Sequence, residues 1–342
     1  MVRTTDLRNN KSDENKGGEM CFNKIEIIRE NVESMINDIF NTHHWEREFL
    51  KTQEMDEIEK YVRMGLWSHS PIVYVQGVKK ESLGTSVYIL FNNRKYILTA
   101  GHIFTDGSPA STDEPLKIDL SKVYIGNGIP LLNLKKGVIY PPAEEDNYQE
   151  KDYALFIVCD DIAHKLEEYY SPVPVATIKG KNSYYPSYGF LYGFPCSKNK
   201  GNKYSLETVS DLCIRAPLDL RSMSPAGKNI SFICNRKNVA TVKEIKNNQR
   251  HIMCKLNGMS GCGIWDIPEY PVEHDPQKMS LSLCGILTNY SSEDNRLIGL
   301  HLDDIIDFLH TGSRQIEQMQ RDEIVYFYRK RKSEKSVSGC NG

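Results

Sequence analysis

The sequence of 342 residues lacks a long hydrophobic run. A helix that crosses a bilayer needs about 20 consecutive apolar residues, and no such stretch exists in this chain. The first twenty residues are polar and charged, and no apolar run follows a basic segment there, so they do not resemble a secretory signal. These two absences predict a cytoplasmic protein without a membrane partner.

A surplus of charge of one sign is also missing. The chain carries 43 Lys and Arg residues against 45 Asp and Glu residues, with a formal net charge of −2 at pH 7. A nearly neutral chain has no global electrostatic field that would attract nucleic acid or an acidic membrane surface. The basic run at 329–332 is interpreted as a solvated terminus. We therefore expect no nucleic-acid partner.

Cysteine is present, but it lacks the spacing of a metal site. The nine cysteines are scattered and include no Cys-x-x-Cys pair, so zinc binding has little support and no metal is expected. Without a secretion signal, most of these thiols are predicted to be reduced and buried as small hydrophobic side chains.

The N-terminal part of the chain is predicted to be helical after a disordered start. Residues 1–20 are rich in polar and charged side chains, which favours disorder. From Phe22 to Phe40 apolar positions recur three and four residues apart, which predicts a helix. The same spacing fits a coiled-coil seam, but the stretch is too short to establish one. A second helix over 45–64 is predicted to end near Gly65, because glycine is common just past a helix C-terminus.

From residue 72 onward the pattern changes to short β-rich runs. These runs are rich in Val, Ile, Tyr and Thr and are bounded by Gly, Pro and Asn, which favours antiparallel strands joined by turns. Asn92-Asn93-Arg94 is predicted to form a hairpin turn. Many short strands of this kind indicate β-barrels. The predicted strands cover residues 72–75, 85–91, 95–99, 122–125, 138–140, 153–158, 188–192, 230–234, 252–256, 264–265, 283–288 and 297–300.

The C-terminal part is predicted to return to helix. Asp303–Leu309 has a helical pattern, and a second helix is expected over 313–328 after a break at Gly312. The chain is thus predicted to divide into four parts: a disordered N-terminus (1–20), a helical segment (21–68), a main β domain with two halves that divide near 165–185 (70–311), and a C-terminal helix with a basic tail (312–342).

A candidate nucleophile lies in the segment Gly258-Met259-Ser260-Gly261. A serine hydroxyl is a poor nucleophile until a base removes its proton, and it also needs backbone N–H donors aimed at the developing oxyanion. The glycines on both sides permit the sharp turn that brings such N–H groups together. A Gly-Ser turn is common in proteins, so this motif is weak by itself.

Two further motifs supply a base and an acid in matching local settings. His102 ends the run Leu98-Thr99-Ala100-Gly101-His102, directly after a predicted strand. Asp152 leads into the predicted buried strand 153–158, and an acid at such a position is unusual unless it is paired. The chain order His, Asp, Ser belongs to the chymotrypsin-like double barrel and differs from the orders of subtilisin and the α/β-hydrolases.

Together these segments resemble the trypsin-like serine peptidases, in their bacterial intracellular form, over roughly residues 72–309. The segment 96–102, Tyr-Ile-Leu-Thr-Ala-Gly-His, is similar to the family signature at the catalytic histidine. Gly84-Thr85-Ser86 resembles the Gly-Thr/Ser-Gly element of relatives. The resemblance implies a mostly β fold with two antiparallel six-stranded, chymotrypsin-like β-barrels, flanked by N-terminal helices and a C-terminal helical extension.

The resemblance also implies a role for each site residue. Ser260 would form an acyl-enzyme with a protein or peptide substrate, His102 would act as general base and then acid, and Asp152 would orient His102. The backbone N–H groups of Gly258 and Ser260 would form the oxyanion hole. This chemistry needs no metal and no organic cofactor. The residues expected to bind the substrate are Cys254, Lys255, Thr288, Asn289 and Tyr290.

The chain departs from the family pattern at two positions beside the nucleophile. Secreted members have an acid before the serine, which pairs with a new N-terminus after cleavage, and Met259 cannot form that ion pair. We therefore predict activity without N-terminal cleavage, with the N-terminal helices packing on the domain or receiving an activating protein partner. Cys262 replaces a usual glycine and is expected to affect the efficiency of the oxyanion hole.

Two other functions stay open beside a serine endopeptidase. A catalytically silent trypsin-like fold could serve as a protein-binding module; the complete set of His102, Asp152 and Ser260 speaks against it. An esterase or lipase of the α/β-hydrolase type needs the order Ser, Asp, His and a Gly-x-Ser-x-Gly elbow. Cys262 breaks that elbow, and the strand-rich pattern lacks alternating helices.

Overall fold

A computed structural model describes the protein at residues 62–76, 80–105, 118–140, 151–175, 188–196, 199–201, 211–219, 229–234, 256–266, 281–318 and 323–326. Backbone contacts divide the chain into two units, residues 1–56 and 57–342, and every described residue belongs to the second. The disordered start, the helix predicted over 22–40, most of the one predicted over 45–64, the predicted strand residues 252–255 and the basic tail lie outside the described residues.

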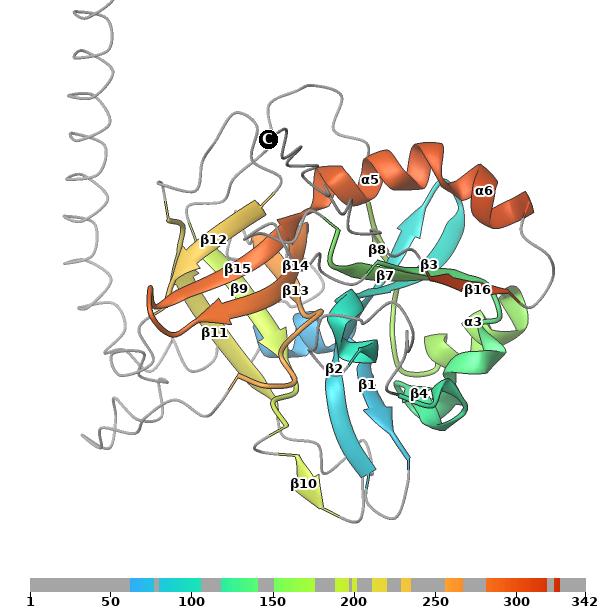
Figure 1. The fold of residues 1–342 in the computed structure, drawn as a ribbon, viewed down its shortest axis with the longest axis horizontal. Helices are drawn as coiled ribbons and strands as arrows, with labels where there is room; N and C mark the ends of the chain where they lie inside the picture. The colour runs from blue at the N-terminus through green and yellow to red at the C-terminus, as the bar shows by residue number, and fades with distance from the viewer. Residues whose placement is uncertain are drawn as a thin grey trace, which may run out of the picture. The chain divides into compact units, whose positions relative to one another are not determined.

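The described residues are mostly β and form two sheets (Figure 1). The larger sheet has ten strands, namely β1 (Ile72–Val75), β2 (Lys80–Phe91), β3 (Arg94–Thr99), β4 (Val123–Ile125), β5 (Ile129–Pro130), β6 (Gly137–Tyr140), β7 (Tyr153–Val158), β8 (Val173–Pro174), β10 (Lys200–Gly201) and β16 (Ile324–Tyr326). Its main path has the order β16-β6-β7-β3-β2-β1-β4-β5, while β8 and β10 pair with β2. Its neighbours are antiparallel except for β16 with β6 and β8 with β2.

The second sheet is smaller and antiparallel throughout. Its six strands are β9 (Tyr188–Gly193), β11 (Leu212–Pro217), β12 (Asn229–Ile233), β13 (Gly263–Asp266), β14 (Ser282–Ser291) and β15 (Arg296–His301), in the order β11-β9-β13-β14-β15-β12. An isolated bridge between Leu218 and Phe232 joins the end of β11 to β12. The N–H of Asp219 donates to the carbonyl of Ser231 at 2.8 Å in the same place.

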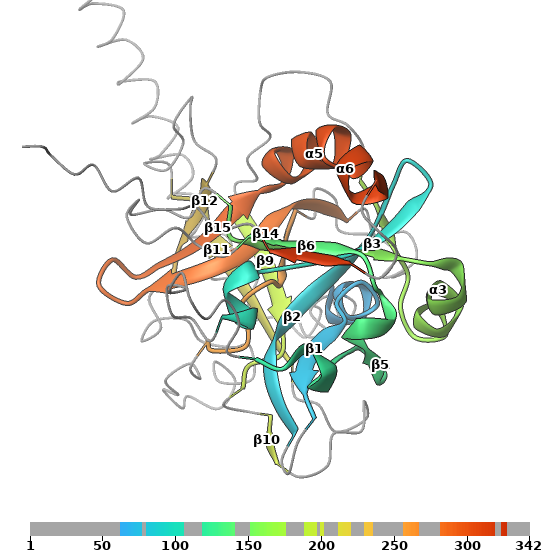
Figure 2. The ribbon, with the colours of Figure 1, turned by 45° about the vertical axis from the view of Figure 1, so that its right-hand side comes forward.

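The helices of the described residues are few and short. In both views α5 and α6 lie together along one margin of the sheets, and α3 lies at another (Figures 1 and 2). None of these helices is long and apolar enough to cross a bilayer. The helices are a turn over 62–67, α3 (Asp160–Glu167), α5 (Leu302–Thr311), α6 (Ser313–Gln318) and the 3-10 turns η1 (Gly101–Phe104), η2 (Leu120–Lys122) and η3 (Leu131–Asn133).

The predicted hairpin between β2 and β3 is confirmed, with a turn of two residues. Phe91 pairs with Arg94, so Arg94 already belongs to β3 and only Asn92 and Asn93 form the turn. Both asparagines have positive φ, at 47° and 61°. Asparagine tolerates this left-handed conformation, and two such residues form the turn whose twist matches the flanking strands. The strand β3 therefore leads directly toward His102.

The strands of the larger sheet bury both of their faces. Leu98 and Leu155 belong to one buried cluster, whereas Ile97 and Phe156, their chain neighbours, belong to another. Side chains alternate between the two faces of a strand, and both faces here meet apolar side chains. This burial on both faces agrees with the continuous apolar runs of β3 and β7.

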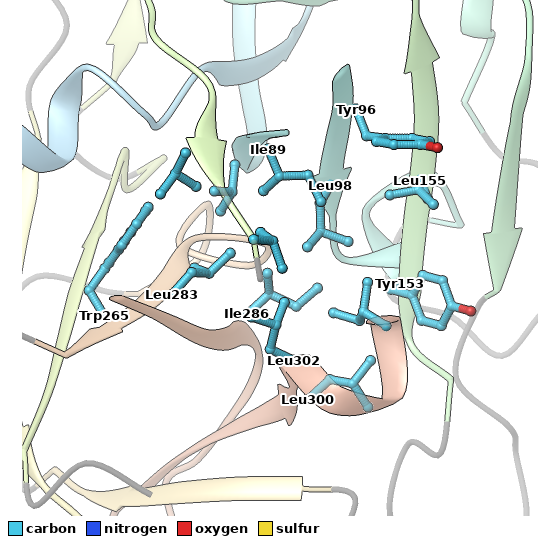
Figure 3. Packing of buried hydrophobic residues seen from close by; sticks show 14 of the residues in the cluster. Ile89, Tyr96, Leu98, Tyr153, Leu155, Trp265, Leu283, Ile286, Leu300 and Leu302 are labelled. Carbon is cyan, nitrogen blue, oxygen red and sulfur yellow. The ribbon is translucent and has the colours of Figure 1, made fainter. Parts of the chain in front are cut away.

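One apolar cluster lies between the two sheets. Figure 3 shows side chains of the larger sheet, such as Ile89 and Leu98, facing Ile286 and Leu300 of the smaller sheet and Leu302 at the start of α5. All five side chains are at least 95% buried. Burial of apolar side chains is the main force that holds two packed sheets together. This cluster therefore determines how the two sheets face each other.

The helical turn at 62–67 differs from its prediction in two respects. It continues through Gly65 to Trp67, so Gly65 does not end the helix. Leu66 is fully buried in the cluster between the sheets, and the Trp67 ring lies 5.5 Å from that of Tyr170. The end of the predicted helical segment is therefore part of the β domain's own core.

The C-terminal helix predicted over 313–328 is wrong in its second half. The helix α6 covers Ser313–Gln318, but Ile324–Tyr326 form β16, which pairs with β6 in parallel. The residues Ile324, Val325 and Tyr326 are β-branched or aromatic and suit an edge strand. The helical spacing of apolar residues over 313–328 outweighed this preference in the prediction. The strand forms because it pairs with β6, a partner far away in the sequence.

Several other elements were not predicted from the sequence. They include the helix α3, which follows β7 directly, and the strands β5, β8, β10 and β11. The short strands β5, β8 and β10 have two residues each, too few for an alternation pattern. The antiparallel order and the scarcity of helices do not match the alternating layers of an α/β-hydrolase.

Substitution of Leu66 tests whether the turn at 62–67 belongs to the folded core. We expect Leu66→Ala to lower the free energy of unfolding by about 2–5 kcal/mol, because it empties a fully buried site. Met64 lies on the same turn with 54% of its surface exposed, so Met64→Ala should change stability by about 0.5 kcal/mol or less. Urea unfolding of both variants measures this, and equal costs would contradict the packing.

Candidate active site

The three residues predicted to carry the chemistry lie together at the junction of the two sheets. Nδ1 of His102 is 2.7 Å from Oδ2 of Asp152, and Nε2 of His102 is 2.9 Å from Oγ of Ser260. The backbone N–H of His102 also donates to Oδ1 of Asp152 at 2.8 Å. Both carboxylate oxygens are thus engaged, and the imidazole links the acid to the serine hydroxyl through its two nitrogens.

Strand pairing explains why Asp152 and His102 meet. The strands β3 and β7 are antiparallel, and Thr99 at the end of β3 pairs with Ala154 near the start of β7. Asp152 precedes β7 and His102 follows β3, so both reach the same edge of the sheet. Glycine is required at position 101, directly before His102, because a Cβ there would overlap the carbonyl of Tyr140.

The surroundings of His102 change its proton affinity. Burial by itself lowers the pKa of His102, because the charged imidazolium loses solvent, but the Asp152 carboxylate raises it through its charge and its hydrogen bond. The net pKa is raised above the ordinary 6.5. Asp152 is fully buried while the His102 side chain keeps 19% of its surface exposed. The contact of Nδ1 with Oδ2 leaves Nε2 to face the hydroxyl of Ser260.

Ser260 lies on a tight loop that two glycines make possible. Gly258 has a φ of 91° and Gly261 a φ of 82°, a region that residues with a Cβ rarely adopt. Within the loop the N–H of Met259 donates to the carbonyl of Leu256 at 2.8 Å, and that of Cys262 donates to the carbonyl of Met259 at 3.0 Å. The loop is therefore a closed double turn with Ser260 at its tip.

Two backbone N–H groups of this loop are free to act as donors. Within the described residues, the N–H groups of Gly258 and Ser260 have no acceptor. The carbonyl of Asn257 accepts from the N–H of Cys196 at 2.6 Å, and this peptide is trans. The C=O and N–H of a trans peptide point to opposite sides, so the Gly258 N–H points away from Cys196. The arrangement suits a developing oxyanion.

Apolar side chains of the same loop are packed into the core. Met259 and Cys262 are completely buried in a cluster with Leu256 and Leu287. Burial raises the pKa of the Cys262 thiol well above its ordinary value, so it stays protonated and acts as a small hydrophobic side chain. Both side chains are therefore accommodated in the apolar core.

Three of the five predicted substrate-binding residues lie on β14 next to this loop. The N–H of Gly261 donates to the carbonyl of Leu287 at 2.7 Å, which attaches the loop to β14 just before Thr288. The register of β13 with β14 ends at Ile286, and β14 continues beside β15 through Asn289 and Tyr290 to Ser291. Thr288, Asn289 and Tyr290 therefore follow directly on the residue that binds the loop of Ser260.

The side chains of these three residues differ in exposure. Thr288 is buried, with its hydroxyl donating to the carbonyl of Ile298 at 3.2 Å. Asn289 is exposed, and its Oδ1 accepts from the N–H of Tyr290 at 2.7 Å. The Tyr290 ring is half-buried against the cluster that holds Met259. The other two predicted residues, Cys254 and Lys255, lie outside the described residues.

The residues that support the nucleophile loop were not among those predicted for the site. Thr85 donates its backbone N–H to the carbonyl of Ser260 at 2.9 Å and its hydroxyl to the carbonyl of Gly258 at 3.1 Å. Its only signal in the sequence was the motif Gly84-Thr85-Ser86. Cys196 had no signal, because it acts through its backbone. No group of His, Cys, Asp and Glu within the described residues could hold a metal ion.

Comparison with known proteins leaves the site to be interpreted from its geometry. No protein-family model and no curated protein matches this chain. The interpretation therefore rests on the distances among Asp152, His102 and Ser260 and on the two free N–H groups. These features define a site in which a base can activate a serine hydroxyl beside oxyanion donors.

Replacement of Asp152 tests the electrostatic coupling of the pair. We expect Asp152→Asn to lower the pKa of His102 relative to the wild type, because burial, which lowers it, remains while the carboxylate charge is lost. Titration of the histidine ring signals by NMR measures this. His69, whose pKa burial lowers, serves as the internal control and should not move. An unchanged His102 pKa would contradict the coupling.

Replacement of Gly261 tests the geometry of the loop. A Cβ there would overlap Oγ1 of Thr99 and the carbonyl of Thr85, whereas a Cβ at Gly128, also at positive φ, would meet only Tyr74 Oη at 3.7 Å. Gly128→Ala should therefore cost only backbone strain of about 1–2 kcal/mol. Gly261→Ala should cost clearly more in urea unfolding. Equal costs would mean that the loop can move aside.

Proposed function

We propose that the protein is a serine endopeptidase of the trypsin-like class. The single observation that carries this proposal is the continuous chain from Asp152 through His102 to Ser260, at 2.7 and 2.9 Å, beside two N–H groups without acceptors among the described residues. Each part separately has a structural explanation. The combination has the geometry that nucleophilic acyl transfer requires.

In the proposed reaction, Oγ of Ser260 attacks the carbonyl carbon of a peptide bond while Nε2 of His102 takes its proton. The oxyanion of the tetrahedral intermediate accepts hydrogen bonds from the N–H groups of Gly258 and Ser260. The C–N bond then breaks, His102 gives the proton to the leaving amine, and the acyl group stays on Ser260. Water, activated by His102 in the same way, releases the acid.

The proposed fold is a pair of β-barrels, with His102 and Asp152 in the first and Ser260 in the second. For the second barrel, support comes from the bridge between Leu218 and Phe232, since β11 and β12 are the two ends of the six-stranded order. A bond between the end strands is what a sheet needs to close on itself. For the first, support is limited to the antiparallel order around β3 and β7.

An extended peptide is the proposed substrate. The segment of β14 after Leu287 is its proposed contact, because Leu287 binds the loop of Ser260. A peptide that lies along this segment would run past the serine hydroxyl. The exposed side chain of Asn289 and the half-buried ring of Tyr290 would contact it.

We further propose that the site assembles without cleavage of the chain. Met259 lies completely buried among apolar side chains, so the loop does not depend on an ion pair with a new N-terminus. The turn at 62–67 adds a polar link, because Arg63 binds Asp211 and Tyr192 donates to the same carboxylate at 2.7 Å. An activating protein partner would act through residues before this turn.

Labelling with a fluorophosphonate probe tests the proposed function. The purified full chain should be labelled without proteolytic processing, and Ser260→Ala and His102→Ala should each abolish labelling, because one removes the nucleophile and the other its base. Mass spectrometry of the adduct should locate it on Ser260. Cleavage of an unstructured protein by the same preparation distinguishes an endopeptidase from an esterase.

Two results would overturn this proposal. Labelling that persists in Ser260→Ala would put the reactive group elsewhere. A well-folded wild type that stays unlabelled, alone and in cell lysate, would favour a binding module over an enzyme. Labelling only in lysate would agree with the proposed enzyme and would indicate that it needs an activating partner.

A further inference from the structure

Thr85 uses all of its polar groups at the junction of the two sheets. It is completely buried in the middle of β2. Its N–H donates to the carbonyl of Ser260 at 2.9 Å, and its hydroxyl donates to the carbonyl of Gly258 at 3.1 Å. The same hydroxyl accepts from the N–H of Phe194 at 3.0 Å, and Oγ1 of Thr99 donates to the Thr85 carbonyl at 2.6 Å.

The hydroxyl of Thr85 acts on the residue whose N–H is a candidate oxyanion donor. Gly258 has no Cβ, so its own conformational preference does not hold it at a φ of 91°. Its conformation depends on the two peptide groups beside it. The peptide after Gly258 is held by the Thr85 hydroxyl, and the peptide before it is held by the N–H of Cys196.

A second route leads from the same hydroxyl to the peptide before Gly258. Phe194 donates its N–H to Thr85, and two residues later Cys196 donates its N–H to the carbonyl of Asn257 at 2.6 Å. Fixing Phe194 therefore helps to fix the group that orients the Gly258 N–H. The approach is tight, since a Cβ at Gly193 would lie only 2.6 Å from Oγ1 of Thr85.

We infer that the hydroxyl of Thr85 is the positioning group that keeps the N–H of Gly258 directed toward the reacting carbonyl. This inference rests on the proposed function, because it assigns Thr85 a role in acyl transfer at Ser260. Thr85 does not touch the substrate. It acts through Gly258 and the segment 194–196, and it takes the place of an ion pair that Met259 cannot form.

A positioning role for the Thr85 hydroxyl predicts effects that differ from those of a hydroxyl that only stabilises the fold. Loss of a structural hydrogen bond lowers stability but leaves the oxyanion donors in place. Loss of the Thr85 hydroxyl would leave the carbonyl of Gly258 and the N–H of Phe194 without their partner, and both peptides beside Gly258 could rotate. The N–H of Ser260 would keep its direction, because the carbonyl of the same peptide group, that of Met259, accepts from the N–H of Cys262.

Thr85→Val is the variant that tests this inference. It keeps the shape and the backbone bonds of Thr85 and removes only the hydroxyl. We expect the rate of fluorophosphonate labelling to fall about 10-fold or more, since loss of one oxyanion donor costs about 100- to 1000-fold and the donor here is displaced only part of the time. Thr85→Ser, which restores the hydroxyl, should label within about 3-fold of the wild type.

Ser86→Ala is the matched control. Ser86 follows Thr85 on β2, is completely buried, and donates its hydroxyl to the carbonyl of Pro71 at 2.7 Å, away from the loop of Ser260. It should lose stability in urea unfolding and keep the wild-type labelling rate.

Steady-state kinetics give a second readout. With a peptide substrate, Thr85→Val should lower kcat with little change in KM. The same variant should weaken the binding of a peptide aldehyde, which forms an oxyanion on Ser260, more than the binding of a product peptide.

The outcomes distinguish this inference from the proposed function. A well-folded wild type that stays unlabelled, alone and in cell lysate, would overturn the proposed function itself. A labelled wild type with equally fast Thr85→Val would overturn only the role of Thr85. Where Thr85→Val does not fold, Thr85→Cys replaces it, because the thiol is a weak donor of similar size; slow labelling of this variant supports the role, and wild-type labelling contradicts it.

Discussion

The apolar cluster between the two sheets is the constraint on which the site depends. His102 and Asp152 belong to the larger sheet and Ser260 to a loop attached to the smaller one. No covalent link or metal holds these parts together within the described residues. Interiors are close-packed, so side chains such as Leu98 and Ile286 allow few relative positions of the sheets. This packing maintains the distance of 2.9 Å between Nε2 of His102 and Oγ of Ser260.

The burial of Asp152 has a second consequence for the site. A buried carboxylate is costly unless it is paired and hydrogen-bonded. Asp152 meets this requirement through two bonds to one residue, the N–H and the ring of His102. The need to hydrogen-bond the buried carboxylate therefore favours this ring orientation, because a ring turned away would leave Oδ2 of Asp152 without its partner. The same interaction that stabilises the fold locally directs Nε2 toward Ser260.

The loop of Ser260 reaches its form through several uncharged contacts. Met259 anchors it in the core, Thr85 and Leu287 bind its backbone, and Cys196 orients the peptide before Gly258. None of these groups carries a charge. The form of the loop among the described residues therefore depends on apolar packing and on backbone hydrogen bonds.

The sequence by itself determined those features whose signals are local. The turn at Asn92 and Asn93, the strands around His102 and the glycines beside Ser260 depend on the conformational preferences of neighbouring residues, and all could be predicted. The tertiary structure alone decided the strand pairing of Ile324–Tyr326, the place of Leu66 in the core and the hydrogen bond of Thr85 to Gly258. The physical reason is the same in each case: these residues gain their partners from segments far away in the chain, and local spacing carries no record of them.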